Sequence, residues 1–486
     1  MLLWLAPLCT ALLIYFSSAP IHQGYLALLA FIPLLFAQER SWKHRLLLGW
    51  LAGFLTQAVA YYWIFLTVRD FGGLSAPLSA LSAVLFWAAQ GLDMGLWLLL
   101  FPLLAPKDSL IPRPLMAAAC WYLLQAHLFP YVFPWVYGAS FIEPAPLGAG
   151  AALWTDHGLG FLAIWMQVGL FCGITEKRDK RYYAAACLLP LALFLGGGLG
   201  RTPAEEQVWR VAVVQPNIIP WAKRNKDTAQ DVFMTHYEKS MQFVRQDVDL
   251  IIWPETAVPF KLNGTTYYEN KLRELAVASD AAVITGAVEY NNKSYYNAIF
   301  LYAPNVDAPQ IYRKAKLVAF SENLPWFLRW ALKFVPQLGG FSAGEHNKPF
   351  DYRGLKIIPL VCYEAMFSDY VNSFQGNLMV NVTNDAWFGK TKASAEHLQQ
   401  TRMRTLEKQI PMVRATNSGI SCWVDIQGQI HDASPVYEEA YPIYEIPIPM
   451  QISDERSRWG ARIIATSAVL LFLWGLASTL KRRNKA

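Results

Sequence analysis

Charged side chains are scarce in this sequence. Asp, Glu, Lys and Arg make up only 16% of its 486 residues, whereas 54% are hydrophobic and the mean hydropathy is +0.22. This composition is too apolar for an ordinary soluble protein. The net charge is a modest +6, so the composition gives no reason to expect a nucleic-acid partner.

The apolar residues cluster into segments long enough to cross a bilayer, which takes about 20 residues. The N-terminal segment lacks the basic start of a secretory signal peptide, so we predict a retained helix there. We predict about eight spans in all, at residues 2–18, 24–37, 46–67, 76–104, 114–129, 158–175, 182–200 and 460–480.

The loop charges predict the orientation. Basic residues gather in alternate loops and in the tail, at 38–45, 105–114, 175–183 and 481–486, whereas the other loops of the bundle carry only Arg69. The positive-inside rule places the basic side, with both termini, in the cytoplasm. We therefore predict a membrane bundle over 1–200, an extracytoplasmic domain over 201–458, and a final span with a basic tail over 459–486.

Cysteine is also rare, and the usual metal-binding spacings are missing. Four of the six cysteines fall in or beside predicted spans, where small buried hydrophobes are expected. Cys362 and Cys422 lie in the external domain, where one disulfide is a possible pairing. No CxxC, HxxxH or HExxH pattern occurs, so we expect no metal site.

The external domain alternates predicted strands with predicted helices, which indicates a layered α/β fold. Several strands are apolar at consecutive positions, as in strands that are buried on both faces. The predicted strands are 208–217, 248–256, 281–290, 297–304, 355–364, 377–385 and 412–419, and the helices are 228–246, 268–279 and 394–409.

Three of the predicted strands end in reactive or polar groups. These are Pro254-Glu255, Cys362-Tyr363-Glu364 and Asn384-Asp385. Because sites in open α/β sheets form beyond the carboxyl ends of strands, we expect these groups to meet in one cleft.

Cys362 could be a small buried hydrophobe or a nucleophile, and a nucleophile needs a base or a positive neighbour. Histidine is the usual base, but none of the domain's histidines stands at a strand end: His236, His346, His397 and His431. A carboxylate base with an ammonium partner is the alternative, and Glu255 and Lys314 are suitable. Taken singly, a Glu or Lys is far more often a solvated surface side chain, so the hypothesis depends on the order of these residues and their flanking sequences.

The order Glu255, Lys314, Cys362 resembles the Glu–Lys–Cys triad of the nitrilase superfamily. More closely, six ordered motifs resemble the bacterial apolipoprotein N-acyltransferase family: WPETAVP, YRKAKLVAFSENLP, VCYEAMF, NVTNDAWFG, EHLQQTRMRTLE and VRATNSGIS. That family has a bundle of about eight membrane helices with a nitrilase-like (αββα sandwich) domain inserted before the last. The resemblance covers nearly the whole chain.

The resemblance implies roles for individual residues. Cys362 would be the nucleophile, Glu255 the general base and Lys314 the oxyanion stabiliser. Auxiliary positions of the active site match Glu322, Tyr363 and Glu364, and substrate-binding positions match Trp221, Asn297 and Trp387. The chain departs from the family pattern at Ala319 and Ser321, where proline and glycine are usual, which changes backbone freedom just before Glu322.

The resemblance also implies the reaction. An acyl chain would pass from the sn-1 position of a phospholipid to Cys362, and then to the N-terminal amine of an S-diacylglyceryl-cysteine apolipoprotein, without a cofactor. We expect a monomer in the bacterial inner membrane. The segment 324–344 is amphipathic and weakly basic, as in segments that lie in a membrane interface.

Two other functions use the same features. A membrane-tethered nitrilase-type amidase would use the same triad with water as the second nucleophile. A transporter or scaffold would use the external domain only for binding, but the spans carry few charges, chiefly Asp93, and a solute pathway usually needs more.

Overall fold

The computed structural model describes residues 2–106, 112–176, 180–198, 205–219, 222, 226–262, 266–319, 321–323, 340–345, 348–450 and 455–484. The chain divides into two compact units, and each is described by itself. The helical unit comprises Met1–Arg201, Thr391–Glu407 and Asp454–Ala486, and the sheet unit comprises Thr202–Lys390 and Lys408–Ser453.

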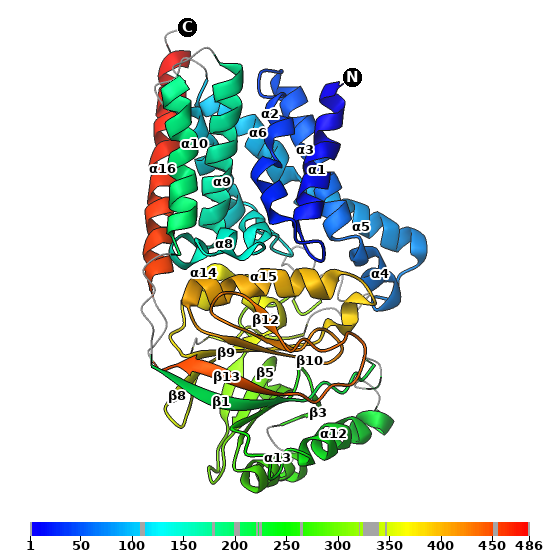
Figure 1. Cartoon of the computed structure of the whole chain (residues 1–486). Helices are drawn as coiled ribbons and strands as arrows, with labels where there is room; N and C mark the ends of the chain where they lie inside the picture. Colours follow the sequence, from blue (N-terminus) through cyan, green and yellow to red (C-terminus); the bar gives the residue numbers. More distant parts are fainter. Residues whose placement is uncertain are drawn as a thin grey trace. The chain divides into compact units, whose positions relative to one another are not determined.

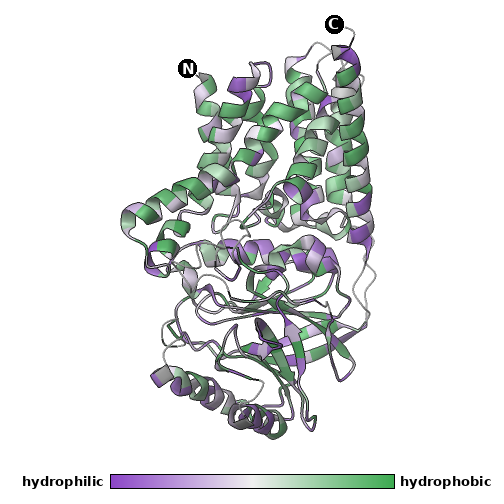
Figure 2. Cartoon of the chain, turned by 180° about the vertical axis from the view of Figure 1, so that it is seen from behind, coloured by the Kyte–Doolittle hydropathy of each residue, from purple (hydrophilic) through white to green (hydrophobic). Residues whose placement is uncertain are grey.

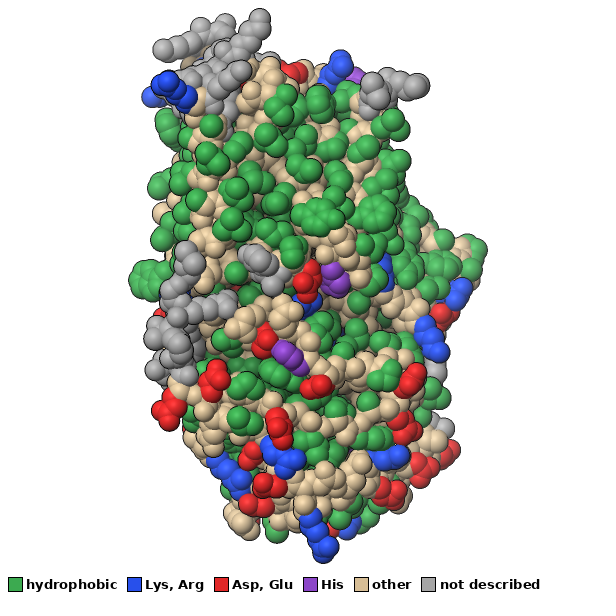
Figure 3. Space-filling view, viewed as in Figure 1, with side chains coloured by type: hydrophobic (Ala, Val, Ile, Leu, Met, Phe, Trp, Pro, Cys, Tyr) green, Lys and Arg blue, Asp and Glu red, His purple; other side chains and the backbone are tan. Residues whose placement is uncertain are grey.

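The helical unit is built from mostly apolar helices (Figures 1 and 2). In Figure 3, hydrophobic side chains cover the visible face of these helices, while charged side chains gather over the sheet unit. The helices of the helical unit are α1 (Ala6–Ser17), α2 (Ile32–Leu35), α3 (Trp42–Ala60), α4 (Trp63–Asp70), α5 (Ala76–Gln90), α6 (Leu92–Leu104), α7 (Arg113–Leu123), α8 (Ala145–Gly148), α9 (Ala151–Thr175), α10 (Lys180–Gly196), α15 (Ala393–Lys408) and α16 (Arg456–Arg483). Helix α15 belongs to this unit as far as Glu407.

The number of membrane spans stays a prediction. Within the described residues, three helical stretches are long and apolar enough to cross a bilayer, namely Ala76–Leu104, Ala151–Thr175 and Arg456–Arg482. The pair α3 and α4 adds a fourth if it counts as one span.

Two helices differ in extent from the segments expected as spans. The segment 46–67 contains two helices, because α3 ends at Ala60 and α4 leaves at an angle of 56°. Tyr61, at the break, has non-helical backbone angles, and its ring lies buried among aromatic neighbours such as Trp63. Helix α9 begins at Ala151, inside the segment predicted as a loop, and passes through a non-helical residue at Thr155.

Helix α15 belongs to the helical unit through buried charges. Arg404 pairs with Asp156 of α9 and, at 3.1 Å, with Glu407 one turn along its own helix. The Glu407 carboxylate also accepts the backbone N–H of Asp156 at 3.0 Å. Buried ions must be paired in this way, since an isolated buried charge is strongly destabilising.

The sheet unit contains two sheets (Figure 1). The first has seven strands in the order β13-β1-β2-β4-β5-β6, with β3 beside β4, and the second has the order β12-β11-β10-β9-β8-β7. Their bounds are β1 Glu206–Val213, β2 Leu250–Ile252, β3 Val258–Lys261, β4 Ala282–Asn291, β5 Ser294–Tyr302, β6 Gln310–Arg313, β7 Phe350–Tyr352, β8 Leu355–Val361, β9 Leu378–Thr383, β10 Met412–Thr416, β11 Cys422–Val424, β12 Ile430–His431 and β13 Ile443–Pro449.

All seven predicted strands are confirmed, and the three predicted helices correspond to α12 (Lys226–Met241), α13 (Thr266–Ser279) and α15. The prediction that strands are buried on both faces is also confirmed. Every residue of β2, β9 and β10 is buried. The α/β class of the external domain is therefore correct.

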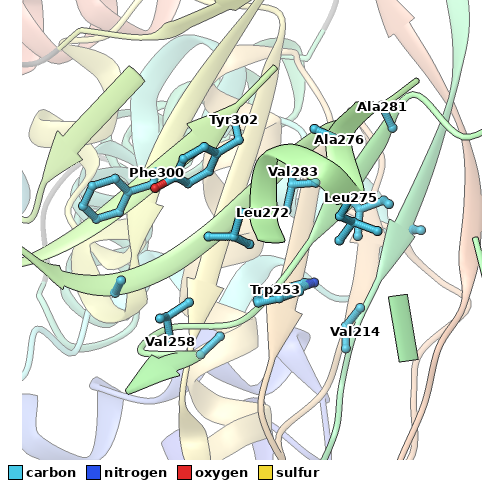
Figure 4. Packing of buried hydrophobic residues seen from close by; sticks show 14 of the residues in the cluster. Val214, Trp253, Val258, Leu272, Leu275, Ala276, Ala281, Val283, Phe300 and Tyr302 are labelled. Carbon is cyan, nitrogen blue, oxygen red and sulfur yellow. The ribbon is translucent and has the colours of Figure 1, made fainter. Parts of the chain in front are cut away.

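Helices α12 and α13 pack on the first sheet over an apolar core (Figure 4). Trp253, Leu272, Val283 and Phe300 are all fully or almost fully buried in this core. Burying one such side chain contributes about 1.5–3 kcal/mol, so the core fixes the strands that lead into the site.

Parallel pairing brings the carboxyl ends of the central strands to the same edges. In the first sheet β1, β2 and β4 are parallel neighbours, and in the second β8, β9 and β10 are. Val361 of β8 pairs with Val382 of β9, so the residues that follow each of them also lie side by side.

Candidate active site

Cys362 stands at the carboxyl end of β8 and begins a short 3₁₀ helix, Cys362–Met366. Its φ is +54°, a left-handed conformation that costs a residue with a side chain roughly 1–3 kcal/mol. The Asn381 side chain holds this turn by donating to the Cys362 carbonyl at 3.0 Å. The thiol is free and half-buried, and so it is presented at a strained strand end.

Lys314 follows β6 directly and its side chain is 1% exposed. The ammonium lies 2.8 Å from Glu322 and 3.6 Å from Glu255. Burial lowers the pKa of Lys314, but the two carboxylates, Glu322 first, outweigh burial and raise it above its ordinary value. The ammonium is therefore a fixed positive charge over the working pH range.

Glu255 follows β2 after Trp253-Pro254, and it is 7% exposed. One carboxylate oxygen accepts from the Asn297 amide at 2.8 Å, and the other accepts from the Asn384 backbone N–H at 3.1 Å. Asn384 lies at the end of β9, so strand ends from both sheets meet here as expected.

The surroundings of Cys362 keep its thiol protonated at rest. Burial raises the pKa of the Cys362 thiol, the Glu255 charge raises it further, and the Lys314 ammonium lowers it. The site thus contains a neutral thiol, a carboxylate that can take its proton and a fixed cation. This set suits nucleophilic acyl chemistry in which the thiolate forms only as it attacks.

Glu322 lies in the site in spite of the departures at Ala319 and Ser321. Its two oxygens accept from the Val318 backbone N–H at 2.9 Å and from Asn297 at 2.9 Å, besides contacting Lys314. The backbone amide of Val318 therefore fixes the carboxylate without the usual proline and glycine.

Glu364 is fully buried and holds the backbone around the site. It accepts four hydrogen bonds, from Tyr312 at 2.8 Å and from the backbone N–H groups of Val361 at 2.9 Å, Ala315 at 2.7 Å and Lys316 at 3.0 Å. Burial raises the pKa of Glu364 to about 7, against the opposing Lys314 charge and these hydrogen bonds. Glu364 thus ties the chain after Lys314 to the chain before Cys362.

Tyr363 donates its hydroxyl to the Leu317 carbonyl at 2.6 Å, and the Lys314 ammonium lies 5.6 Å from the centre of its ring. The ring therefore lies beside the ammonium, and the auxiliary role of Tyr363 stays a prediction.

The substrate-binding predictions have different outcomes. Asn297 is 2% exposed and joins Glu255 to Glu322, which places it in the site. Trp387 is half-buried in the 3₁₀ helix Asp385–Phe388. Trp221 and residues 324–339 lie outside the described residues. All these substrate-binding roles stay predictions.

Two of the histidines considered as partners of Cys362 have other neighbours, and His346 lies outside the described residues. His236 is buried beside Trp253, and His431 pairs with Asp425 at 2.8 Å. The considered Cys362–Cys422 disulfide is absent, since both thiols are free. A search of the described residues found no metal-binding group of three His, Cys, Asp or Glu side chains.

Sequence reasoning predicted Asp385 at this cleft but missed three residues that lie near it. Thr383 and Arg414 lie in one buried cluster with Asp385 beside Cys362, and Gly286 lies directly against the Glu255 backbone. The apolar run that ends in Asn384-Asp385 gave the signal for Asp385.

Comparisons with known families match both parts of the chain. The Carbon-nitrogen hydrolase family matches residues 210–451, and the Apolipoprotein N-acyltransferase N-terminal domain matches residues 10–169. Together these two matches cover Glu255, Lys314 and Cys362 and most of the N-terminal helices.

Similar proteins match over nearly the full length. An apolipoprotein N-acyltransferase from Azotobacter vinelandii is 30% identical, over 99% of this chain and 95% of that protein. One from Pseudomonas syringae pv. tomato is 30% identical, over 90% and 89%. Among solved structures, an amidase from Nesterenkonia sp. is 15% identical with a TM-score of 0.37, over 51% of this chain and 93% of that one.

Proposed function

The chain belongs to the apolipoprotein N-acyltransferase family, and from this premise we propose that it acylates lipoproteins through a thioester on Cys362. The observation that carries the mechanism is the position of the Lys314 ammonium. It is buried between Glu255 and Glu322 at the strand ends where the strained Cys362 stands.

The first half-reaction takes the acyl chain from a phospholipid. Glu255 accepts the thiol proton as the Cys362 sulfur attacks the sn-1 ester carbonyl, and the carbonyl oxygen becomes an oxyanion beside the Lys314 ammonium. When this intermediate collapses, the bond from the carbonyl carbon to the glycerol oxygen breaks, and Glu255 returns the proton to that oxygen. The products are a lysophospholipid and the thioester.

The second half-reaction gives the acyl chain to the lipoprotein. The N-terminal amine of the S-diacylglyceryl-cysteine attacks the thioester carbonyl and loses a proton to Glu255. The carbon–sulfur bond then breaks, and Glu255 protonates the departing thiolate. The product is an amide, and both Glu255 and Cys362 regain their starting protonation states.

The apolar helices support a bilayer as the place of reaction. Both substrates are lipids, so confining the enzyme and its substrates to one membrane keeps the effective concentration of each high. We place the enzyme in the bacterial inner membrane, with both termini cytoplasmic and residues 201–458 outside the cytoplasm. The distribution of Lys and Arg between the loops supports this orientation.

Intact-protein mass spectrometry tests the proposal. Detergent-purified chain is incubated with a phospholipid of defined acyl chains, and we expect a mass gain of one acyl group. Hydroxylamine should release this group, and Cys362→Ala should not acquire it. Addition of a diacylglyceryl-cysteine peptide should then move the acyl group to the peptide amine.

The other outcomes point to the alternatives. A chain that forms no lipid adduct but hydrolyses small amides through Cys362 would be a membrane-tethered amidase. A chain with neither activity would refute the role of Cys362 as a nucleophile.

A further inference from the structure

A chain of hydrogen bonds links four polar side chains beside Cys362 that take no part in the steps above. Asn381, Thr383, Asp385 and Arg414 are each at most 1% exposed. Polar groups so deeply buried are costly unless each has a partner, so their arrangement needs a physical reason.

The strand register places Thr383 next to the nucleophile. Val361 pairs with Val382 across β8 and β9, and Cys362 and Thr383 are the next residues on each strand. Thr383 lowers the pKa of the Cys362 thiol, so its hydroxyl lies within reach of the sulfur that must become a thiolate.

The remaining members of the network fix the position of Thr383. Its hydroxyl donates to Asp385 at 3.2 Å, and the other Asp385 oxygen accepts from Arg414 at 2.9 Å. Arg414 also donates to Asn381 at 2.6 Å, and Asn381 donates to the Cys362 carbonyl at 3.0 Å. One network therefore holds both the backbone of Cys362 and the group beside its sulfur.

The Thr383–Asp385 hydrogen bond is long for its type. A hydroxyl that donates to a carboxylate usually does so at about 2.5–2.7 Å. At 3.2 Å the bond is weak, and Asp385 retains Arg414 as its main partner. The Thr383 hydrogen can therefore be redirected at small cost.

The charges around the sulfur make an additional donor useful. Three charged groups face it from three parts of the chain, namely Glu255 after β2, Lys314 after β6 and Asp385 after β9. The two carboxylates oppose a negative sulfur and the ammonium favours it. A hydroxyl donor stabilises the thiolate without adding another charge.

We propose that Thr383 is a catalytic residue whose hydroxyl turns from Asp385 to the Cys362 sulfur as the thiolate forms. Asp385, Arg414 and Asn381 are positioning residues in this arrangement. The inference rests on the proposed thiol chemistry of Cys362. Glu255 takes the thiol proton, the Thr383 O–H bond only rotates, and no proton leaves Thr383. The hydroxyl returns to Asp385 when the sulfur carries an acyl group.

Two matched substitutions test this role in the full-length, detergent-purified chain. Thr383→Val keeps the shape and removes the hydroxyl, whereas Thr383→Ser keeps the hydroxyl. The first measurement is the rate at which iodoacetamide alkylates Cys362 from pH 6 to 10, followed on the Cys362 peptide by mass spectrometry. The second is the rate of acyl-thioester formation with a defined phospholipid.

We expect Thr383→Val to move the alkylation profile up by about one pH unit, which is about tenfold in rate at a fixed pH below the midpoint. Thioester formation should slow about tenfold or more, and Thr383→Ser should stay within about threefold of the wild type in both measurements. An unshifted alkylation profile in Thr383→Val would overturn the proposal, even if acylation slows. The proposal would also be overturned if Thr383→Ser and Thr383→Val slowed alkylation and thioester formation equally.

Thermal unfolding of each variant shows whether the comparison is between folded proteins. If Thr383→Val does not fold, Thr383→Ala removes the hydroxyl with less bulk and carries the same expectations. The alkylation measurement needs no lipid substrate. If the wild type forms no thioester, the acyl-transfer proposal fails, while the shift between the variants still decides the role of Thr383.

Discussion

The Lys314 ammonium lies 2.8 Å from the Glu322 carboxylate, and their side chains are only 1% and 13% exposed. Coulomb attraction is stronger in such a shielded pair than in water. Because Glu322 is nearer to Lys314 than Glu255 is, Glu322 supplies most of the counter-charge. In the proposed mechanism, this arrangement leaves Glu255 freer to accept a proton from Cys362.

Replacing Glu322 by glutamine tests whether Glu322 neutralises Lys314 while Glu255 transfers the proton. In Glu322→Gln, Glu255 at 3.6 Å is the one carboxylate of the described residues that still forms an ion pair with the ammonium. We therefore expect Glu255 to be held more firmly in its charged form and to be a weaker base. We expect thioester formation to fall about 10²-fold, of the size seen when one group that stabilises an oxyanion is lost. The rate of thioester formation can be measured by stopped-flow or quenched acylation with a defined phospholipid.

The matched control for this variant is Glu274→Gln, which removes a charge from an exposed pair with Lys271. Surface pairs contribute about 0–1 kcal/mol, so this variant should acylate like the wild type. If Glu322→Gln also acylates at the wild-type rate, Glu322 does not control the charge balance of the site.

Glu255→Gln should affect two measurements in opposite directions. The Glu255 charge raises the pKa of the Cys362 thiol, so its removal lowers that pKa and leaves the Lys314 ammonium to favour the thiolate. At pH 8 iodoacetamide should therefore alkylate Cys362 faster than in the wild type. Thioester formation should nevertheless fall at least 10²-fold, because no base remains to move the proton.

Faster alkylation together with slower thioester formation would exclude a general disruption of the site, because such a disruption would slow both reactions or unfold the domain. Slower alkylation in Glu255→Gln would contradict the assigned electrostatics. Retained acylation would show that another group is the base.

Part of this site could be predicted because its members follow apolar runs. Glu255 and Cys362 each follow a buried strand, and the motif around Lys314 completes the set. Thr383 could not be found in this way. A threonine inside a strand is common because of its β-branched side chain, and only the register between β8 and β9 shows what its hydroxyl meets.

Hydropathy had the same limitation in the helical unit. Residues 57–66, around Tyr61 and Tyr62, include no proline or glycine, so the usual sequence signals of a bend are missing between α3 and α4. The short strands β3, β6, β7, β11 and β12 were not predicted, because two to four residues show no clear alternation. The seven-residue strand β13 was not predicted either, since it contains two prolines, which are rare inside strands.

Glu364 gives the sheet unit a specific dependence on pH. Its pKa is raised from 4.5 to about 7 in the folded chain, so the folded state binds a proton that the unfolded state has released. The resulting stability is complete below about pH 4.5 and is lost as the pH rises through about 7. Between pH 5.5 and 7 the loss should be roughly 2 kcal/mol.

Thermal unfolding from pH 5.5 to 8 should show this decline in the wild type. Glu364→Gln cannot satisfy all four donors and should be less stable at every pH, but its stability should lack the decline. Glu238→Gln, at an exposed position, should keep the wild-type slope. A Glu364→Gln slope equal to that of the wild type would refute the assignment.

Gly286 of β4 is the last test, because it shows how closely the site is packed. A Cβ added there would lie 2.7 Å from the Glu255 Cα, 2.7 Å from the Thr256 nitrogen and 2.8 Å from the Pro254 oxygen. These are backbone atoms, so Gly286→Ala must move the loop that carries Glu255. Such overpacking costs about 1–3 kcal/mol in stability. Since an error of 1 Å in catalytic geometry can reduce rates about 10²-fold, we expect thioester formation to fall by that much.

Gly196→Ala is the control, because the methyl added there has no neighbour within 4 Å. It should change neither the stability nor the rate of thioester formation. If Gly286→Ala acylates normally, the position of Glu255 is not critical, and its role as the base would have to be given up.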